Sequence, residues 1–342
     1  MNRIQFCSSC SSCKILSILY MPFMACETAP AGAVSTGQRM KTILVTGGAG
    51  FIGATLCPLL LAQGYRVRVL DDLSVGSAAA LAGVPVDLQE GDIRDEGAVA
   101  AAVAGVDGIV HLAAHTSVVD SQTQPQHDFD VNVRGTLNLL LAARDAGVRR
   151  FVFASSNAPI GENTPPIDES KPARPLSPYG ASKLAGEGYC SAFWGSYGLG
   201  TVVLRFANVY GPRSTHKGSV VAKFIKDALA AGELTIYGDG EQTRDFIYVE
   251  DLCRAVIAGL ASECGGETFQ IATGVETSVN HLAGLLRDLL PGHALRIRHV
   301  PQRAGEIIKN YSAIGKAQRV LGWQPQVPLA AGLANTVQWF LT

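Results

Sequence analysis

Tyr179 and Lys183 have the residue types and the spacing for acid–base chemistry. They stand four positions apart in the segment YGASK, so on a helix both side chains lie on one face. Tyrosine is a poor base at its ordinary pKa of about 10, and a fixed ammonium one turn away favours the phenolate and lowers that pKa. The pair can then act as general acid or base on a substrate hydroxyl beside a hydride acceptor. Ser156, at the end of a predicted strand facing the same crevice, can hydrogen-bond that hydroxyl or the ketone formed from it.

In isolation, a tyrosine and a lysine at this spacing are usually a surface pair, so the chemistry depends on a cofactor site nearby. The apolar run 43–45 is typical of a buried parallel strand. It is followed by TGGAGFIG and then by a leucine-rich helical pattern. Glycine lets the backbone turn tightly and approach a pyrophosphate, and the start of the helix offers free N–H groups to the anion. This segment predicts a phosphate-binding turn.

Asp71 predicts which dinucleotide the turn binds. It ends the second predicted strand, about twenty residues past the glycines, where a carboxylate meets the adenosine ribose hydroxyls. A carboxylate there would repel a 2′-phosphate, which favours NAD over NADP. The alternative interpretation is a turn or helix-capping aspartate.

The order of apolar and helical patterns predicts an α/β fold with a doubly wound parallel sheet, the Rossmann arrangement. After Pro212 the pattern becomes irregular, as expected for a smaller C-terminal α/β substrate domain. We predict a cofactor domain over 40–211 and a substrate domain mainly over 212–342, with about 245–274 returning to the first. The expected strands are 43–45, 65–70, 86–88, 108–112, 150–154 and 201–206, and the expected helices include 97–104, 129–147 and 178–197.

Composition excludes some classes of partner. The chain has 342 residues and a net charge of −1, so nothing argues for binding nucleic acid or an anionic membrane. Histidines in the body lack metal-ligand spacing, and His111, inside a predicted strand, is expected to be a core residue. The cysteines of the body are widely spaced, which is not a disulfide framework and suits a reducing compartment; we therefore expect a cytoplasmic protein.

The first 39 residues differ from the rest. The run CSSCSSC has the spacing of some metal and iron–sulfur sites, but no further ligand cluster completes one, so a disordered tail is favoured. The apolar run 15–25 could pass for a secretory segment and is too short to span a membrane. Because Met40 directly precedes the first strand, we predict that residues 1–39 are a disordered or non-native leader.

Together these motifs identify a resemblance that extends from about Lys41 to Trp339. The chain resembles the extended short-chain dehydrogenase/reductases, and within them the nucleotide-sugar epimerases of the UDP-glucose 4-epimerase type. The segments that carry the resemblance are TGGAGFIG, DDLSVG, GDI, HLAA, VNVRGT, SS at Ser155, SPYGASK, LRFANVYGPR, GDGEQTRDFIYVED and LGW.

The resemblance implies a role for each matching residue. Ser156, Tyr179 and Lys183 would be catalytic, with Tyr179 as the base and Lys183 on the nicotinamide ribose. Asn208, Arg244 and Arg303, with Ser156, would bind the substrate, the arginines gripping its diphosphate. The residues that would bind NAD are Gly47, Gly50, Phe51, Ile52, Gly53, Asp71, Asp92, Ile93, Ala113, Ala114, Asn132, Tyr179 and Lys183. It also implies a homodimer formed by the helices at 129–147 and 178–197.

One difference within the family favours epimerisation. Where family dehydratases have Thr-Asp-Glu and decarboxylases have a Glu after the fifth strand, an ungapped match gives Asn157 and Ala158. No carboxylic acid is then supplied for eliminating water, which leaves oxidation and re-reduction at C4 of a UDP-sugar. The alternatives are another nucleotide-sugar enzyme, such as a UDP-glucuronate 4-epimerase or a reductase, and a non-catalytic NAD-binding regulator.

Two departures concern the sugar. The usual Val-Tyr after the serine is Pro159-Ile160, which is expected to reshape the sugar pocket. The position that limits space near the C2 substituent falls at Asn310, where a residue smaller than tyrosine would leave room for an N-acetyl group. UDP-glucose, UDP-galactose and their N-acetyl analogues therefore remain candidate substrates.

Overall fold

Seven parallel strands form one sheet in the order β11-β6-β5-β4-β1-β2-β3, which confirms the predicted doubly wound fold. The structure is a computed structural model, and it describes residues 41–290, 295–302 and 307–342. The predicted leader at 1–39 and Arg303 lie outside the described residues. The strands of the sheet are β1 (Thr42–Thr46), β2 (Arg66–Asp71), β3 (Asp87–Glu90), β4 (Gly108–His111), β5 (Arg150–Ser156), β6 (Gly200–Phe206) and β11 (Glu267–Ile271).

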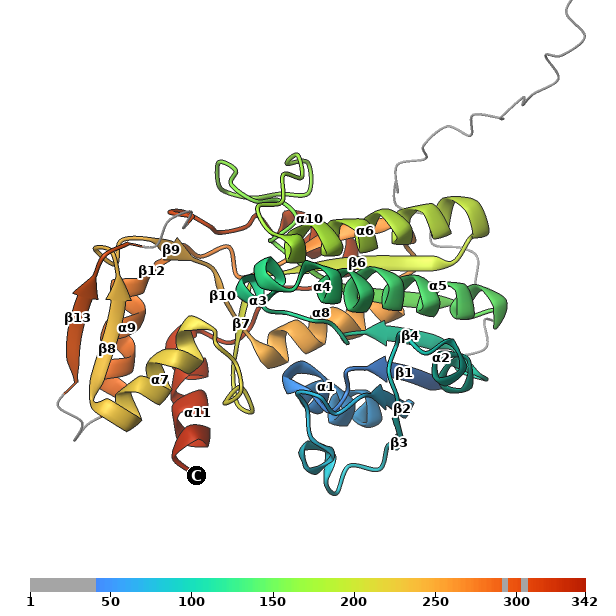
Figure 1. Cartoon of the computed structure of the whole chain (residues 1–342), viewed down its shortest axis with the longest axis horizontal. Helices are drawn as coiled ribbons and strands as arrows, with labels where there is room; N and C mark the ends of the chain where they lie inside the picture. Colours follow the sequence, from blue (N-terminus) through green and yellow to red (C-terminus); the bar gives the residue numbers. More distant parts are fainter. Residues whose placement is uncertain (1–40, 291–294, 303–306) are drawn as a thin grey trace, which may run out of the picture. The chain divides into compact units, whose positions relative to one another are not determined.

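Helices cover both faces of the sheet (Figure 1), which is why the central strands are apolar on both sides. One face packs against α1 (Phe51–Ala62) and α8 (Val249–Ala261). The other packs against α2 (Glu96–Val103), α5 (Gly135–Asp145) and α6 (Pro178–Tyr197). His111 of β4 is 1% exposed and contacts Thr46 and Thr136, so the prediction of a core histidine is confirmed.

The helix predicted over 129–147 differs from the observed one. The chain is helical already in α4 (Pro125–Phe129), because Pro125 occupies the first turn, and a short helix α3 (Val118–Thr123) precedes it. A π-helical turn over Asp130–Arg134 separates α4 from α5. Such turns are frequent at functional sites, and this one contains Asn132.

The C-terminal helices and strands group beside the main sheet (Figure 1), and their apolar residues form a second, smaller core. Its apolar residues come mainly from helices α7, α9 and α11 and from strand β8, which pairs in parallel with β13. Its elements are α7 (Val220–Ala231), β8 (Glu233–Tyr237), α9 (Val279–Leu289), β13 (Arg296–Val300) and α11 (Leu329–Leu341). The remaining elements are the pair β7 (Asn208–Tyr210) and β10 (Phe246–Tyr248), the pair β9 (Thr243–Arg244) and β12 (Thr277–Ser278), the turn Ala78–Leu81, and α10 (Gly315–Leu321).

Among the described residues, no helix combines the length and apolar character needed to cross a lipid bilayer.

Candidate active site

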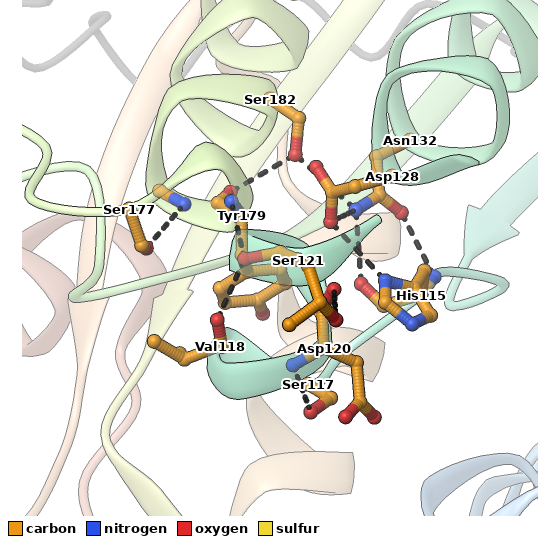
Figure 2. A network of polar contacts seen from close by, with 12 residues as sticks. His115, Ser117, Val118, Asp120, Ser121, Asp128, Asn132, Ser177, Tyr179 and Ser182 are labelled. Carbon is orange, nitrogen blue, oxygen red and sulfur yellow. Dashed lines mark hydrogen bonds and ion pairs between the residues drawn. The ribbon is translucent and has the colours of Figure 1, made fainter. Parts of the chain in front are cut away.

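The start of α6 fixes where Tyr179 lies. Ser177 caps the helix, its Oγ accepting a hydrogen bond from Gly180 N at 3.1 Å, and Pro178 occupies the first helical position. The backbone N of Tyr179 donates to Ser121 Oγ of α3 at 3.2 Å (Figure 2). Cap, proline and cross-helix contact therefore hold the first turn of α6 at the carboxyl ends of the strands.

The structure brings Ser156, Tyr179 and Lys183 together. Ser156 ends β5, and its side chain hydrogen-bonds that of Tyr179. Lys183 is 3% exposed, and its Nζ donates to the Ala154 carbonyl at 2.9 Å. A hydroxyl and a phenol thus meet where β5 and α6 adjoin, and the ammonium one turn further along α6 is held against β5, an arrangement that can move a proton at a bound hydroxyl.

Burial dominates the electrostatics of this group. It raises the pKa of Tyr179, with the charge of Asp128 acting in the same direction and the hydrogen bond to Ser156 opposing it. The expectation that Lys183 lowers this pKa is therefore not met by the protein alone; the positive charge of a nicotinamide would act in the expected direction. Burial also lowers the pKa of Lys183 to about 8, against the opposing charges of Asp128 and Glu187.

Asn132, in the π-helical turn, organises the segment after β4 (Figure 2). Its Oδ1 accepts from His115 N and its Nδ2 donates to His115 O, both at 2.9 Å. The same Nδ2 lies 3.0 Å from Asp128 Oδ1 and 3.2 Å from Ser182 Oγ. Asn132 is 2% exposed, so its amide fixes the backbone just beyond Ala113 and Ala114 and links it to α6.

The glycine turn between β1 and α1 fits a phosphate group. Gly47 has φ +69°, and a Cβ on it would lie 2.7 Å from Ala113 N. A Cβ on Gly53 would meet the backbone of Gly48. Gly50 begins α1 without a side-chain cap, so the N–H groups that open this helix, from Phe51 onward, remain to meet an anion.

Asp71 lies at the end of β2 beside this turn. It is 6% exposed, and its two oxygens accept hydrogen bonds from Ala49 N and Leu73 N, each at 2.9 Å. Burial raises its pKa, and the two N–H groups oppose that shift. The carboxylate of Asp71 therefore connects the end of β2 to the glycine turn, at the place where the adenosine ribose is expected to bind.

Alanine at position 47 is expected to damage this site locally. Gly47→Ala places a Cβ in a left-handed backbone and against Ala113, so the free energy of unfolding should fall by about 1–3 kcal/mol. The NAD content of the purified protein should fall with it, measured from the absorbance of released nucleotide. Gly188→Ala is the matched control, since a Cβ there meets nothing within 4 Å; equal NAD contents in the two variants would contradict the assignment.

The other predicted binding residues lie in several settings. The carboxylate of Asp92 is paired with Arg94, while the Ile93 side chain is 4% exposed and packs in the core. Further along the chain, Asn208 Nδ2 donates to Asp245 O at 3.1 Å, and Arg244 Nη1 donates to Thr243 O and Ile307 O, both at 2.8 Å.

Sequence reasoning missed several residues that support the site. Ser121 and Ser182 bond to the first turn of α6, and Asp128 lies among them. Glu187 binds Arg205 of β6 from the helix that carries Lys183. Only Glu187 had a signal, because it stands four positions after Lys183 on the same face of the helix.

Comparisons with known proteins agree with this geometry. The model of the NAD dependent epimerase/dehydratase family matches residues 43–272. The chain is 41% identical over 314 residues to a UDP-glucose 4-epimerase of Mycolicibacterium smegmatis, covering 88% of this chain and 98% of the relative. The structure of a UDP-glucose 4-epimerase from Thermotoga maritima with UDP-glucose is similar, with a TM-score of 0.83 and 38% identity over 88% of this chain and 98% of that one. A UDP-N-acetylglucosamine 4-epimerase from Methanobrevibacter ruminantium in complex with UDP-N-acetylmuramic acid has a TM-score of 0.84 and 32% identity, with 89% and 99% coverage.

Proposed function

The chain belongs to the NAD-dependent epimerase/dehydratase family, and we propose that Ser156, Tyr179 and Lys183 carry out its reaction, the inversion of a UDP-sugar at C4. It is an NAD-dependent nucleotide-sugar epimerase. The observation that carries the assignment of residues is the contact between Ser156, at the end of β5, and Tyr179 of α6, with the buried ammonium of Lys183 on the same helix.

The three residues divide the proton chemistry at the sugar. The phenolate of Tyr179 takes the proton of the C4 hydroxyl, and the Ser156 hydroxyl hydrogen-bonds the oxygen that becomes the ketone. When bound, NAD would accept the hydride from C4 of the sugar and return it. Lys183 holds positive charge beside the phenolate, and Tyr179 gives the proton back after the keto sugar has presented its other face. Because the oxidised cofactor is restored in each cycle, we expect tight NAD retention.

The residues after β5 favour epimerisation over dehydration. Asn157 follows Ser156, and its Nδ2 donates to Ser312 Oγ at 3.1 Å, so this position offers an amide engaged with the C-terminal part. Ala158 donates its N–H to Ser156 Oγ at 3.1 Å and carries no acid. Elimination of water across C5 and C6 needs a group that donates a proton there, and neither residue can do so.

We also propose which parts of the chain bind the cofactor and which bind the substrate. Residues 40–211, with about 245–274, would hold the cofactor, and the rest of 212–342 would bind the sugar nucleotide. This division is supported by α8 and β11, which pack on the main sheet, and by the separate core around α7, α9 and α11. Asn208 and Arg244, from strands between the two cores, would contact the substrate diphosphate, and Arg303 is proposed with them on the resemblance alone.

Epimerisation at C4 is tested by incubating the purified protein with a panel of UDP-hexoses and UDP-uronic acids, without added NADH, and following each sugar by NMR. We expect the C4 epimer of a neutral UDP-hexose. Inversion restricted to UDP-glucuronate would favour the uronate epimerase instead. Turnover only with added NADH would favour a reductase, and no turnover of any sugar would favour a non-catalytic regulator.

Asn310 is proposed to leave room for an N-acetyl group at C2 of the sugar. It is half-buried, and its Oδ1 lies 3.5 Å from Asn157 Nδ2, next to Ser156. Asn310→Tyr is expected to lower kcat/KM for UDP-N-acetylglucosamine at least about tenfold and to change that for UDP-glucose about twofold or less. Lys309→Tyr places the same side chain at an exposed neighbour and should change neither. Equal losses for both sugars would refute this role.

We further propose a cytoplasmic homodimer. Apolar side chains are exposed on the two predicted helices at 129–147 and 178–197, namely Phe129, Trp194 and Tyr197, as expected where the same helices of two copies meet. The four described cysteines are free, which suits a reducing compartment. Light scattering of the purified protein would give a monomer mass if the dimer is wrong.

A further inference from the structure

A hollow of about 310 Å³ lies beside the glycine turn, and residues from the second half of the chain contribute to its lining. Its inner wall consists of Gly50 and Phe51 at the start of α1, and of Gly76 in the loop after β2. Its lining also includes Arg213 and His216, which follow β7. The start of a helix without a side-chain cap therefore faces a cationic segment across a space large enough for two phosphates.

The segment that carries Arg213 is held in place by its own contacts. Arg213 Nη1 donates to Ala80 O at 3.1 Å, which ties it to the turn beyond β2. Ser214 Oγ donates to Gly211 O at 2.6 Å. Lys226 Nζ, from α7, donates to the carbonyls of Thr215 and Lys217, both at 2.9 Å. The guanidinium is thereby kept at the rim of the hollow.

We propose that Arg213 binds the diphosphate of the dinucleotide, as the cation opposite the N–H groups of the glycine turn. A guanidinium presents a fixed fork of donors that matches phosphate oxygens, whereas the turn and the start of α1 offer only neutral N–H groups. The inference rests on NAD as the cofactor. It makes the second half of the chain a direct part of the cofactor site.

Of the cationic side chains near the hollow, Arg213 is the one expected to supply the positive charge for the diphosphate. Burial lowers the pKa of His216, and the charges of Lys217 and Lys226 lower it further, so the charged form of its imidazole is disfavoured. The ammonium of Lys226 is directed at backbone carbonyls of its own segment. Since Arg213 also bonds to Ala80, we expect the segment that carries Arg213 to separate from the loop after β2 before the nucleotide leaves, which would slow its release.

The test compares a ligand that has the diphosphate with one that lacks it. Protein freed of nucleotide is titrated with ADP and with adenosine by calorimetry, as wild type, Arg213→Gln and Arg213→Lys. Arg213→Gln should lower the affinity for ADP about tenfold or more and leave the affinity for adenosine unchanged. Arg213→Lys should have an intermediate affinity for ADP. The NAD content of the purified proteins should follow the same order, highest in the wild type, lower in Arg213→Lys and lowest in Arg213→Gln.

Arg319→Gln is the matched control, because it removes one exposed positive charge on α10, a helix that does not line the hollow. Equal losses for ADP and adenosine in Arg213→Gln would make Arg213 a structural tether and overturn the inference. So would an ADP affinity equal to that of Arg319→Gln. If the wild type binds neither ligand and contains no NAD, the proposed cofactor itself fails, which is a different outcome.

Discussion

Tyr179→Phe is expected to lower kcat by about 10³-fold while leaving the protein folded and loaded with NAD. The substitution removes one hydroxyl, which is the group that exchanges the C4 proton and contacts Ser156. Tyr179 is 9% exposed, and its ring stays in place because its backbone N is bound by Ser121. Interconversion of UDP-glucose and UDP-galactose measures the loss, and the absorbance of released nucleotide measures the retained cofactor.

Tyr189→Phe is the control for this change. Tyr189 lies on the same helix and is 38% exposed, so loss of its hydroxyl should leave kcat within about twofold of the wild type. Unchanged turnover in Tyr179→Phe would show that another group moves the proton. A loss of NAD together with activity would point to cofactor binding as the role of the tyrosine.

The sheet and its cofactor turn were predictable because their signals are local. The apolar run of β1, the glycines after it and the acid at the end of β2 each follow from backbone and solvation requirements within a few residues. Tyr179 and Lys183 share a helix face by spacing alone. Strand ends shifted by one or two residues because pairing with neighbouring strands, such as β2 with β3, decides where a strand stops.

The supporting contacts were not predictable because they join distant segments. Asn132 acts through a π-helical turn, which no periodicity in the sequence marks, on a backbone segment 17 residues away. Arg213 reaches the carbonyl of Ala80 across 133 residues of sequence. Such contacts depend on how elements pack, and a single sequence contains no record of that packing.

The contact between Glu187 and Arg205 joins two buried charges, and breaking it is expected to have the largest effect on stability. Glu187 Oε1 accepts from Arg205 Nε at 2.9 Å and from Ser155 Oγ at 2.6 Å, and its Oε2 accepts from Arg205 Nη2 at 2.7 Å. Both charged side chains are at most 9% exposed. Through these hydrogen bonds, Glu187 connects α6, which carries Tyr179 and Lys183, to β5 and β6.

Glu187→Gln should lower the free energy of unfolding by about 3–5 kcal/mol, because it leaves the charge of Arg205 buried without a counterion. Thermal unfolding should shift down by about 10 °C. Asp227→Asn is the control, since its pair with Lys223 is 31% and 40% exposed and should contribute no more than about 1 kcal/mol. A similar small change in both variants would show that the buried pair contributes nothing.

A double variant separates stability from positioning. Arg205 Nη1 has no hydrogen-bond partner in the part of the chain that the structure describes, so the pair is incompletely satisfied. Glu187→Leu with Arg205→Met should therefore recover most of the unfolding free energy, because apolar groups replace both charges. If the pair also positions α6, kcat should stay low in this stable protein, while KM for the UDP-sugar and the retained NAD change little. If kcat recovers fully together with stability, the pair has only a structural role. Ser155 would then have lost Glu187 as its hydrogen-bond acceptor with no effect on the catalysis that involves the adjacent Ser156.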